Sequence, residues 1–177
     1  LRIASVNTSN AVLNTWAPDA SDHVQVLCSD GQKIFAGGDF MMVGGEPHYR
    51  IAALEDHTGV TTSWSPQVDD GIVSSLAKNG STIYASGSFT HANGTIRNNA
   101  AAFNMTTGVI TTWDPAPDGE VRAMAPYSGT LFLGGYFDFI GGQTRYGIAK
   151  VNGVSGVAQS WDAQGLYNTT IEALAVY

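Results

Sequence analysis

Charged residues are scarce in this chain: they make up 13% of its 177 residues, with 8 Lys and Arg against 15 Asp and Glu. The formal net charge of −7 leaves no basic stripe of the kind that binds nucleic-acid phosphates or anionic membrane surfaces. No apolar run approaches the roughly 18–20 residues that a bilayer span requires. We therefore expect no nucleic-acid partner and no membrane span in this segment.

Cysteine is nearly absent as well. The single Cys28 excludes a disulfide within the chain. Its setting, VLCSD, is typical of the end of a buried strand, where a free cysteine behaves as a small apolar residue. Helical periodicity and helix caps are missing too, which favours short strands joined by turns. The chain opens on LRIASV, already within a strand pattern, and no targeting segment is visible.

What the chain does contain is a repeat. Two aromatic series share one period: Trp16, Trp64, Trp113 and Trp161 are spaced by 48, 49 and 48 residues, and Phe40, Phe89 and Phe137 by 49 and 48. Turn glycines keep the same spacing. A period of this length is typical of solenoids and propellers, so the repeat decides the fold class.

Each unit predicts four antiparallel strands, which in the second unit cover 73–77, 82–89, 100–103 and 109–113. An Asn-Gly turn, favoured in tight hairpins, separates the first two. Four strands in about 49 residues indicate a β-propeller blade. Small residues in the second strand would let neighbouring blades approach closely, as at Gly37, Gly38, Gly134 and Gly135.

The expected fold is therefore all-β, with three complete blades and a partial blade at each end. We place the complete blades at 24–72, 73–120 and 121–170, the two-strand partial blade at 1–23, and the first strand of a further blade at 171–177. A ring needs at least four blades. We expect the segment to belong to a larger propeller or to close with further copies of itself.

In the first unit, the repeat shows a recognisable pattern of residues: Gly37-Gly38-Asp39-Phe40, Gly44-Gly45, Ile51-Ala52-Ala53-Leu54, Thr58-Gly59 and Trp64-Ser65-Pro66. It resembles the β-propeller repeats of secreted bacterial multidomain proteins that contain PKD-type modules. It is also similar to the repeats of fungal cortical polarity-marker surface glycoproteins. The resemblance covers essentially the whole chain and implies an extracellular propeller, with no catalytic residues to transfer.

Half of the ten asparagines stand in N-x-Ser/Thr sequons: Asn7, Asn79, Asn93, Asn104 and Asn168. The repeat places all of them in turns or loops, where a glycosyltransferase could reach them. The alternative is that Asn, Ser and Thr gather in turns for their own hydrogen bonds. Glycosylation would imply a eukaryotic secretory route and an extracellular or cell-surface location.

Acidic residues gather in the loops that precede each unit, and the candidate calcium ligands are Asp69, Asp70, Asp118 and Glu120. The competing interpretation is solvated turn residues, since no D-x-D-x-D-G loop is present. Arg50, Arg97 and Arg145 occur in successive loops and could form a strip for an acidic glycan, or could shield strand ends.

The function favoured by these patterns is a non-catalytic extracellular propeller module, a structural or adhesive scaffold that binds protein or glycan at a blade face. A lectin-like propeller, using the loop arginines and aromatics, is the alternative. A polysaccharide-active enzyme with paired carboxylates among Asp69, Asp70, Asp118 and Glu120 is a third possibility. Fold alone does not separate them.

Overall fold

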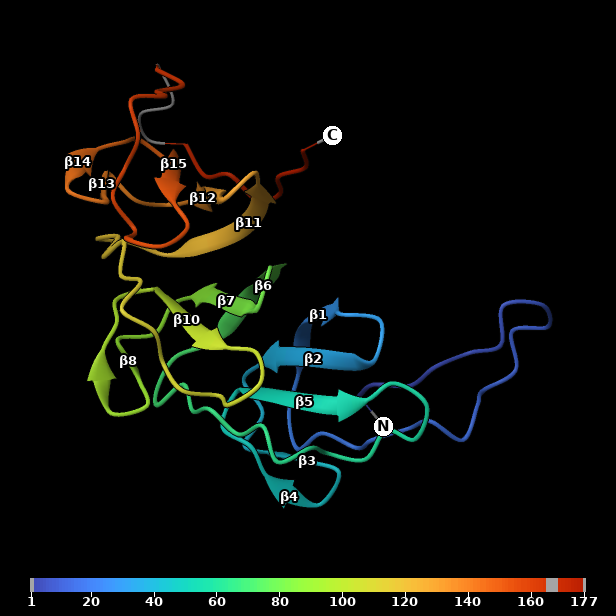
Figure 1. Ribbon diagram of the computed structural model, residues 1–177. Coiled ribbons are helices and arrows are strands. Elements are labelled where there is room, and N and C mark those ends of the chain that lie inside the picture. Colours follow the sequence, from blue (N-terminus) through green and yellow to red (C-terminus); the bar gives the residue numbers. More distant parts are fainter. Residues whose placement is uncertain (1, 165–168, 177) are drawn as a thin grey trace.

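The computed structural model describes residues 2–164 and 169–176, and within them it is all-β. Fifteen strands form six small antiparallel sheets, and no helix occurs among the described residues. Figure 1 shows the chain passing from one group of strands to the next in sequence order. The expected all-β class is therefore confirmed.

Three larger sheets follow one another along the chain, each with three strands and with the second strand in the centre. The first comprises β1 (Val24–Ser29), β2 (Lys33–Gly38) and β5 (Ile51–Glu55). The second comprises β6 (Val73–Asn79), β7 (Thr82–Gly87) and β10 (Ala100–Asn104). The third comprises β11 (Val121–Tyr127), β12 (Thr130–Gly135) and β15 (Ile148–Asn152).

Each unit also contains a two-stranded hairpin between its second and third long strands, where the sequence predicted only a loop. These hairpins are β3 (Met42–Val43) with β4 (Glu46–Pro47), β8 (His91–Ala92) with β9 (Thr95–Ile96), and β13 (Phe139–Ile140) with β14 (Gln143–Thr144). Figure 1 shows them at the margin of the molecule.

The predicted fourth strand, 109–113, is not a full strand. It contributes one isolated bridge, Phe103 to Ile110, and Leu54–Thr61 and Val151–Ala158 repeat this bridge in the other units. The backbone N–H of Trp113 donates to the hydroxyl of Thr111 at 3.3 Å, and that of Trp64 to the hydroxyl of Thr62 at 3.2 Å. In the third unit Gln159 stands at the position of Thr111, and the bridge there is isolated as well. The four-stranded blade is thus corrected to three strands and a bridge.

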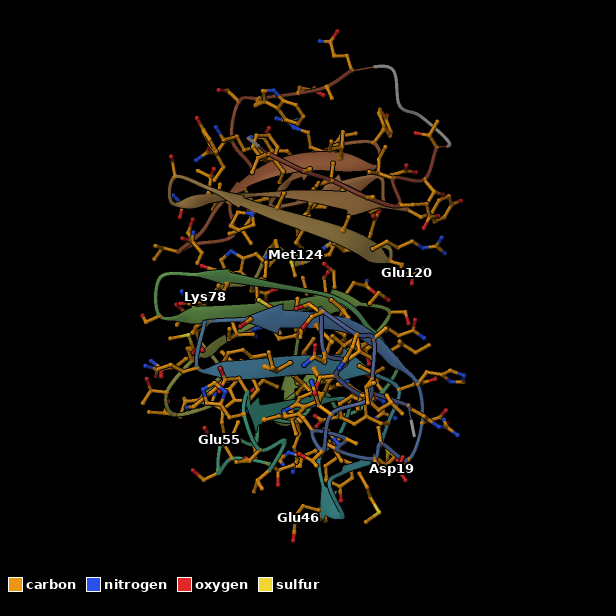
Figure 2. The ribbon with its side chains drawn as sticks, turned by 90° about the vertical axis from the view of Figure 1, so that its right-hand side faces the viewer. Asp19, Glu46, Glu55, Lys78, Glu120 and Met124 are labelled. Carbon is orange, nitrogen blue, oxygen red and sulfur yellow. The ribbon has the colours of Figure 1, made fainter. Side chains whose placement is uncertain are left out.

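The three sheets stack face to face. Strand β6 lies against β1 and β2 of the preceding sheet, and β11 lies against β6 and β7. Figure 2 shows this stacking, with Met124 between the third sheet and the second. The main apolar clusters lie between sheets, as in the one that joins Phe35 and Trp64 to Val73 and Phe103.

The two glycines of each pair are needed for different reasons. A Cβ at Gly37 would lie 2.6 Å from Val73 Cγ1 in the next sheet, and one at Gly134 would lie 2.6 Å from Ile171 Cγ2. The second glycine instead meets its own unit: a Cβ at Gly38 would lie 2.0 Å from the carbonyl oxygen of His23. The first position therefore sets the sheet spacing, and the second accommodates the bulge at the start of the first strand.

Each buried tryptophan reaches into the following unit. The indole Nε1 donates to the carbonyl of the last residue of the next third strand: Trp16 to Glu55 at 2.9 Å, Trp64 to Asn104 at 2.9 Å, and Trp113 to Asn152 at 3.0 Å. The edge-to-face contact between Trp64 and Phe103 of the next unit adds to the second joint. Trp64 also contacts Phe35, and Trp113 contacts Tyr84, each within its own unit. The unit boundary is thus closed by the same bond three times.

Candidate functional site

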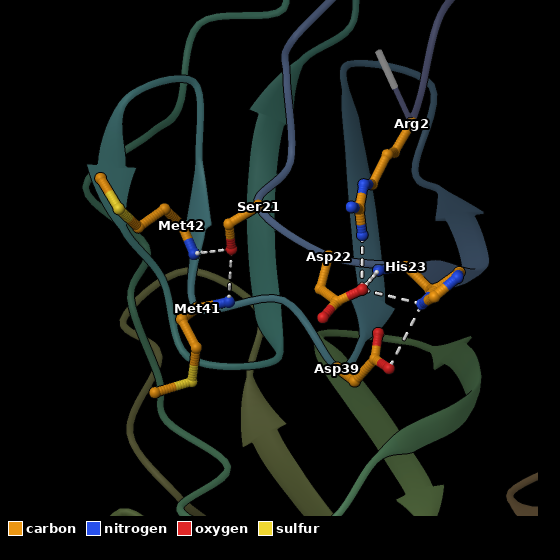
Figure 3. A network of polar contacts seen from close by, with 7 residues as sticks. All are labelled: Arg2, Ser21, Asp22, His23, Asp39, Met41 and Met42. Atoms are coloured by element: carbon orange, nitrogen blue, oxygen red, sulfur yellow. Dashed lines mark hydrogen bonds and ion pairs between the residues drawn. The ribbon is translucent and has the colours of Figure 1, made fainter.

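A polar network with three potential metal ligands lies where the first unit begins (Figure 3). His23 Nδ1 lies 2.8 Å from Asp22 Oδ1 and 3.5 Å from Asp39 Oδ2. The guanidinium of Arg2 donates to the same Asp22 oxygen. One His nitrogen and two carboxylate oxygens, all within 4.8 Å of one another, could serve as ligands of a cation.

The local backbone brings these residues together. Asp22 and His23 end the loop before β1, and Asp39 follows β2, its N–H donating to the His23 carbonyl at 3.2 Å. The repeat places Gly71, Ile72 and Ser88 at the equivalent positions of the second unit, and Gly119, Glu120 and Tyr136 in the third. The cluster is therefore specific to the first unit.

Arg2 already places a positive charge beside the Asp22 carboxylate of this cluster. The backbone N–H of His23 donates to the Asp22 carboxylate at 2.9 Å, and Arg2 adds a second donor. These bonds hold the pKa of Asp22 below its usual range, although burial alone would raise it. As it stands, the network ties residue 2 to the loop before β1, and a cation would have to displace Arg2.

This cluster is not among the sites that the sequence predicts. Asp39 is separated from His23 by 16 positions and joins it only through the β1–β2 pairing. The signal that could have found it is the repeat itself. Positions 22, 23 and 39 all depart from the residue types that the other units carry there.

The four acids proposed as calcium ligands do not form a three-ligand cluster among the described residues. Asp69 Oδ2 accepts the N–H of Gly94 at 2.8 Å, and Glu120 pairs with Arg122 at 2.9 Å. Asp70 and Asp118 each accept backbone N–H groups of the adjacent hairpin. Each acid serves its own loop, and the structure does not bring the four together.

Asp70 and Asp118 share their role with Ser21. The Ser21 hydroxyl accepts the N–H groups of Met41 and Met42, both at 3.0 Å (Figure 3). Asp70 accepts those of Thr90 and His91 at 2.7 and 3.2 Å, and Asp118 those of Asp138 and Phe139 at 2.9 and 3.0 Å. A side-chain acceptor at this position therefore anchors the start of each hairpin.

The arginines do not line up as one exposed strip. Arg97 and Arg145 occupy equivalent positions, and their side chains are 13% and 9% exposed. Arg97 Nη2 donates to the Thr111 carbonyl and Arg145 Nη2 to the Gln159 carbonyl, both at 2.9 Å. These donors hold each hairpin to the segment that leads to the next tryptophan, so little of either guanidinium faces solvent.

Arg50 belongs to a different position of the repeat. Its φ is +65°, and Asn99 and Gly147 share this left-handed backbone at +58° and +70°. The Arg50 side chain donates from Nε to the Gly71 carbonyl at 2.7 Å and from Nη1 to the Val68 carbonyl at 3.0 Å. It thus bonds to the linker between the first and second units.

The sequons differ in how their side chains are used. Asn7 is exposed, and its Oδ1 accepts from the backbone N–H and hydroxyl of Ser9 at 2.9 and 2.7 Å. Asn104 is half-buried, and its Oδ1 accepts the N–H groups of Thr106 and Thr107. Asn79 ends β6 beside the tight turn. Asn168 lies outside the described residues.

Asn93 is the exception, because both ends of its amide are bonded. Its Oδ1 accepts the N–H of Gln67 at 2.7 Å, and its Nδ2 donates to the Gly108 carbonyl at 3.3 Å. Glycosylation replaces one of the two Nδ2 hydrogens, so a glycan here would have to fit beside the Gly108 carbonyl that this amide contacts. This asparagine fastens the β8–β9 hairpin to the linker before β6.

Cys28 is half-buried and packs against the apolar cluster between the first two sheets. Burial raises the pKa of its thiol. A thiolate nucleophile needs the opposite shift. The environment is therefore that of an apolar core residue.

A surface hollow of about 600 Å³ lies between residues 15–18 and 58–63, and among the described residues that line it Glu46 alone has an ionisable side chain. Acid–base hydrolysis of a glycoside uses two carboxyl groups across the scissile bond. This hollow lacks the second one.

Comparison with known proteins gives no family assignment. No protein-family model matches the chain, and no curated protein matches it either. Among the described residues there is also no apolar helix long enough to cross a membrane.

Proposed function

We propose that the chain is a non-catalytic scaffold, a series of β-propeller blades in an extracellular or surface glycoprotein. The observation that carries this proposal is the indole–carbonyl bond, made by Trp16, Trp64 and Trp113 at three successive unit boundaries. Units joined by one repeated contact form a regular array whose loops are presented at constant spacing. Such an array suits display and adhesion.

The state of the candidate catalytic carboxylates and of the candidate glycan-binding arginines supports the same proposal. Asp70 and Asp118 accept hairpin N–H groups, and Arg97 and Arg145 donate to backbone carbonyls. Side chains whose hydrogen bonds hold the loops in place are poorly suited to proton transfer. The polar residues of the loops thus serve the architecture.

Sequon geometry supports the secretory part of the proposal. Asn7 is exposed in a turn, and its amide Nδ2 makes no hydrogen bond to a described residue. Asn104 lies in an equivalent turn with only its Oδ1 engaged. Two accessible amides at repeat-related turns are what a glycosylated array would present.

A glycan-binding function is the second candidate, and one observation favours it. The hairpin of the third unit exposes three aromatic side chains, Tyr136, Phe139 and Tyr146, at 61%, 44% and 38%. Tyr136 shares a small hollow with Asp118 and Asp138. Aromatic faces beside carboxylates suit stacking on sugar rings combined with bonds to their hydroxyls.

A glycan array with the wild-type chain and Tyr136→Ala separates the two candidates. The scaffold proposal expects no saturable saccharide signal that depends on Tyr136. A signal that Tyr136→Ala abolishes, while a substitution at the equivalent Ser88 leaves it intact, would replace the scaffold with a lectin.

A further inference from the structure

One position of the repeat holds the hairpins in place, and the first unit has a different residue there. Arg97 and Arg145 occupy this position in the second and third units, and His48 occupies it in the first. Both arginines donate from Nη2, at 2.9 Å, to a carbonyl of the segment that leads to the next tryptophan. Each also lies near a carboxylate, Asp114 at 3.7 Å or Asp162 at 3.8 Å. A pair of opposite charges thus supports each of these two hairpins.

The first unit replaces both members of that pair. Ser65 stands at the position of Asp114 and Asp162. The backbone N–H of His48 still closes the hairpin by donating to the Met41 carbonyl at 3.0 Å. The residue is only 4% exposed, and its Nδ1 is buried with no hydrogen-bond partner among the described residues. The imidazole is therefore enclosed without the bonds that a charged group requires.

The charged groups around His48 do not offset this burial. Burial lowers the pKa of His48, and the smaller effect of the Glu46 carboxylate in β4 raises it. Residues 58–63, which share a surface hollow with the hairpin, contain no charged side chain. Arg50 donates to carbonyls of the linker between the first and second units. Asp19 lies in the linker before β1, and its carbonyl accepts an N–H of the hairpin at 2.9 Å.

We propose that the β3–β4 hairpin is an acid-sensitive element, which protonation of His48 releases while the arginine-held hairpins stay in place. The hairpin is tied to the linker before β1 by the bond from the Gly44 N–H to the Asp19 carbonyl and by the bridge between Ala20 and Val43. Ala20 and Val43 are 4% and 1% exposed. Release therefore uncovers apolar surface on one unit alone as the pH becomes mildly acid.

The sign of the effect follows from burial. In an unfolded chain histidine has a pKa of about 6.5, and the folded hairpin holds His48 below its ordinary value. The unfolded form then binds more protons, so stability is complete above the unfolded-state pKa and falls as the pH drops toward the folded-state pKa. His91 in the second hairpin is exposed and lies 3.9 Å from Asp70, so its protonation adds an attraction. The third hairpin, within 138–147, contains no histidine and is the internal reference.

Hydrogen exchange of the whole chain between about pH 8 and about pH 5, corrected for the intrinsic rate, compares the hairpins at 41–48 and 138–145. We expect protection of the first to fall at least about threefold relative to the third. The double variant His48→Arg with Ser65→Asp copies the other units and should keep the relative protection constant. His57→Gln, at a side chain that is 91% exposed, should show the wild-type dependence.

Thermal melts verify that each variant folds, and an NMR titration of the wild-type imidazoles needs no variant. His48 should titrate at a lower pH than the exposed His57. Equal titration of the two, constant relative protection in the wild type, or a pH dependence that persists in His48→Gln would each overturn the proposal. The proposal needs neither secretion nor glycosylation, so a positive glycan array would overturn the scaffold function and leave this hairpin unaffected.

Discussion

The first and second sheets are built from the same sequence pattern but differ in burial. Residues 75–77 of β6 are all buried, because β1 covers one face and β11 the other. Residues of β1 alternate between half-buried and exposed. The pattern of a strand therefore determines which residues can be buried, and the neighbouring unit determines whether they are.

The largest difference expected between the two sheets is at the equivalent leucines, Leu76 and Leu27. Leu76→Ala removes a side chain enclosed between two sheets and should lower the free energy of unfolding by about 3 kcal/mol. Leu27→Ala at the equivalent, half-exposed position should cost less than about 1 kcal/mol. Urea unfolding of both variants measures the difference. Equal losses would show that the two sheets are not covered differently in solution.

The tryptophan joints give the next largest contrast. Trp64→Phe removes the donor to the Asn104 carbonyl and leaves a cavity, so we expect a loss of about 2 kcal/mol. Trp161 is 38% exposed and contacts Phe132 edge to face. Trp161→Phe should cost less than about 1 kcal/mol. If the indole–carbonyl bond of Trp64 did not contribute to stability, both substitutions would cause the same small loss in the free energy of unfolding.

The side chain that anchors each hairpin can be used to test whether a residue of one unit can replace its equivalent in another. Asp70→Ala should cost about 1 kcal/mol by leaving the N–H groups of Thr90 and His91 without their acceptor. Asp70→Ser copies the first unit, where Ser21 makes these bonds, and should retain most of the stability. A serine variant as unstable as the alanine variant would contradict the shared role.

The pH dependence of Asp70 has a definite sign. Burial alone would raise its pKa, but the hydrogen bonds from Thr90 and His91 hold that pKa below its usual range. A carboxyl whose pKa is lower folded than unfolded stabilises the fold above its unfolded-state pKa of about 4. That contribution is lost as the pH falls through the folded-state value. Melting temperatures between neutral and acid pH should therefore fall less steeply for Asp70→Ser.

The prediction with the smallest expected effect on stability concerns glycosylation. If the chain is expressed through a eukaryotic secretory route, we expect glycan at Asn7 and little at Asn93, whose Nδ2 is bonded to the Gly108 carbonyl. Peptide mapping after glycosidase treatment measures occupancy at each site. Full occupancy at Asn93 would mean that the β8–β9 hairpin forms only after the glycan is attached.

Periodicity predicted what depends on alternation and spacing. The first three strands of each unit, the role of Gly37 against the next sheet and the burial of Trp64 and Trp113 all agree with the repeat. The prediction of a full fourth strand was wrong, because each unit keeps only one bridge there, whether Thr or Gln stands two residues before the tryptophan. How far this segment pairs with the third strand depends on its tertiary contacts, which residue propensity does not register.

Site chemistry was less accessible from the sequence. Arg97 and Arg145 look like surface arginines in a loop, but the hairpins that the sequence did not predict turn their guanidinium groups toward carbonyls. The Asp22, His23 and Asp39 cluster depends on a pairing between strands. Such side-chain placement follows from tertiary structure, and the repeat indicates only where a unit is exceptional.

The indole–carbonyl joints lie in series along the chain, one at each boundary between units. Tension applied between the two ends would therefore pass through every joint, and each broken joint would release one unit of about 48–49 residues. Stretching a single molecule should give a sawtooth of evenly spaced ruptures, so that the array yields in steps under mechanical load while its remaining units stay folded.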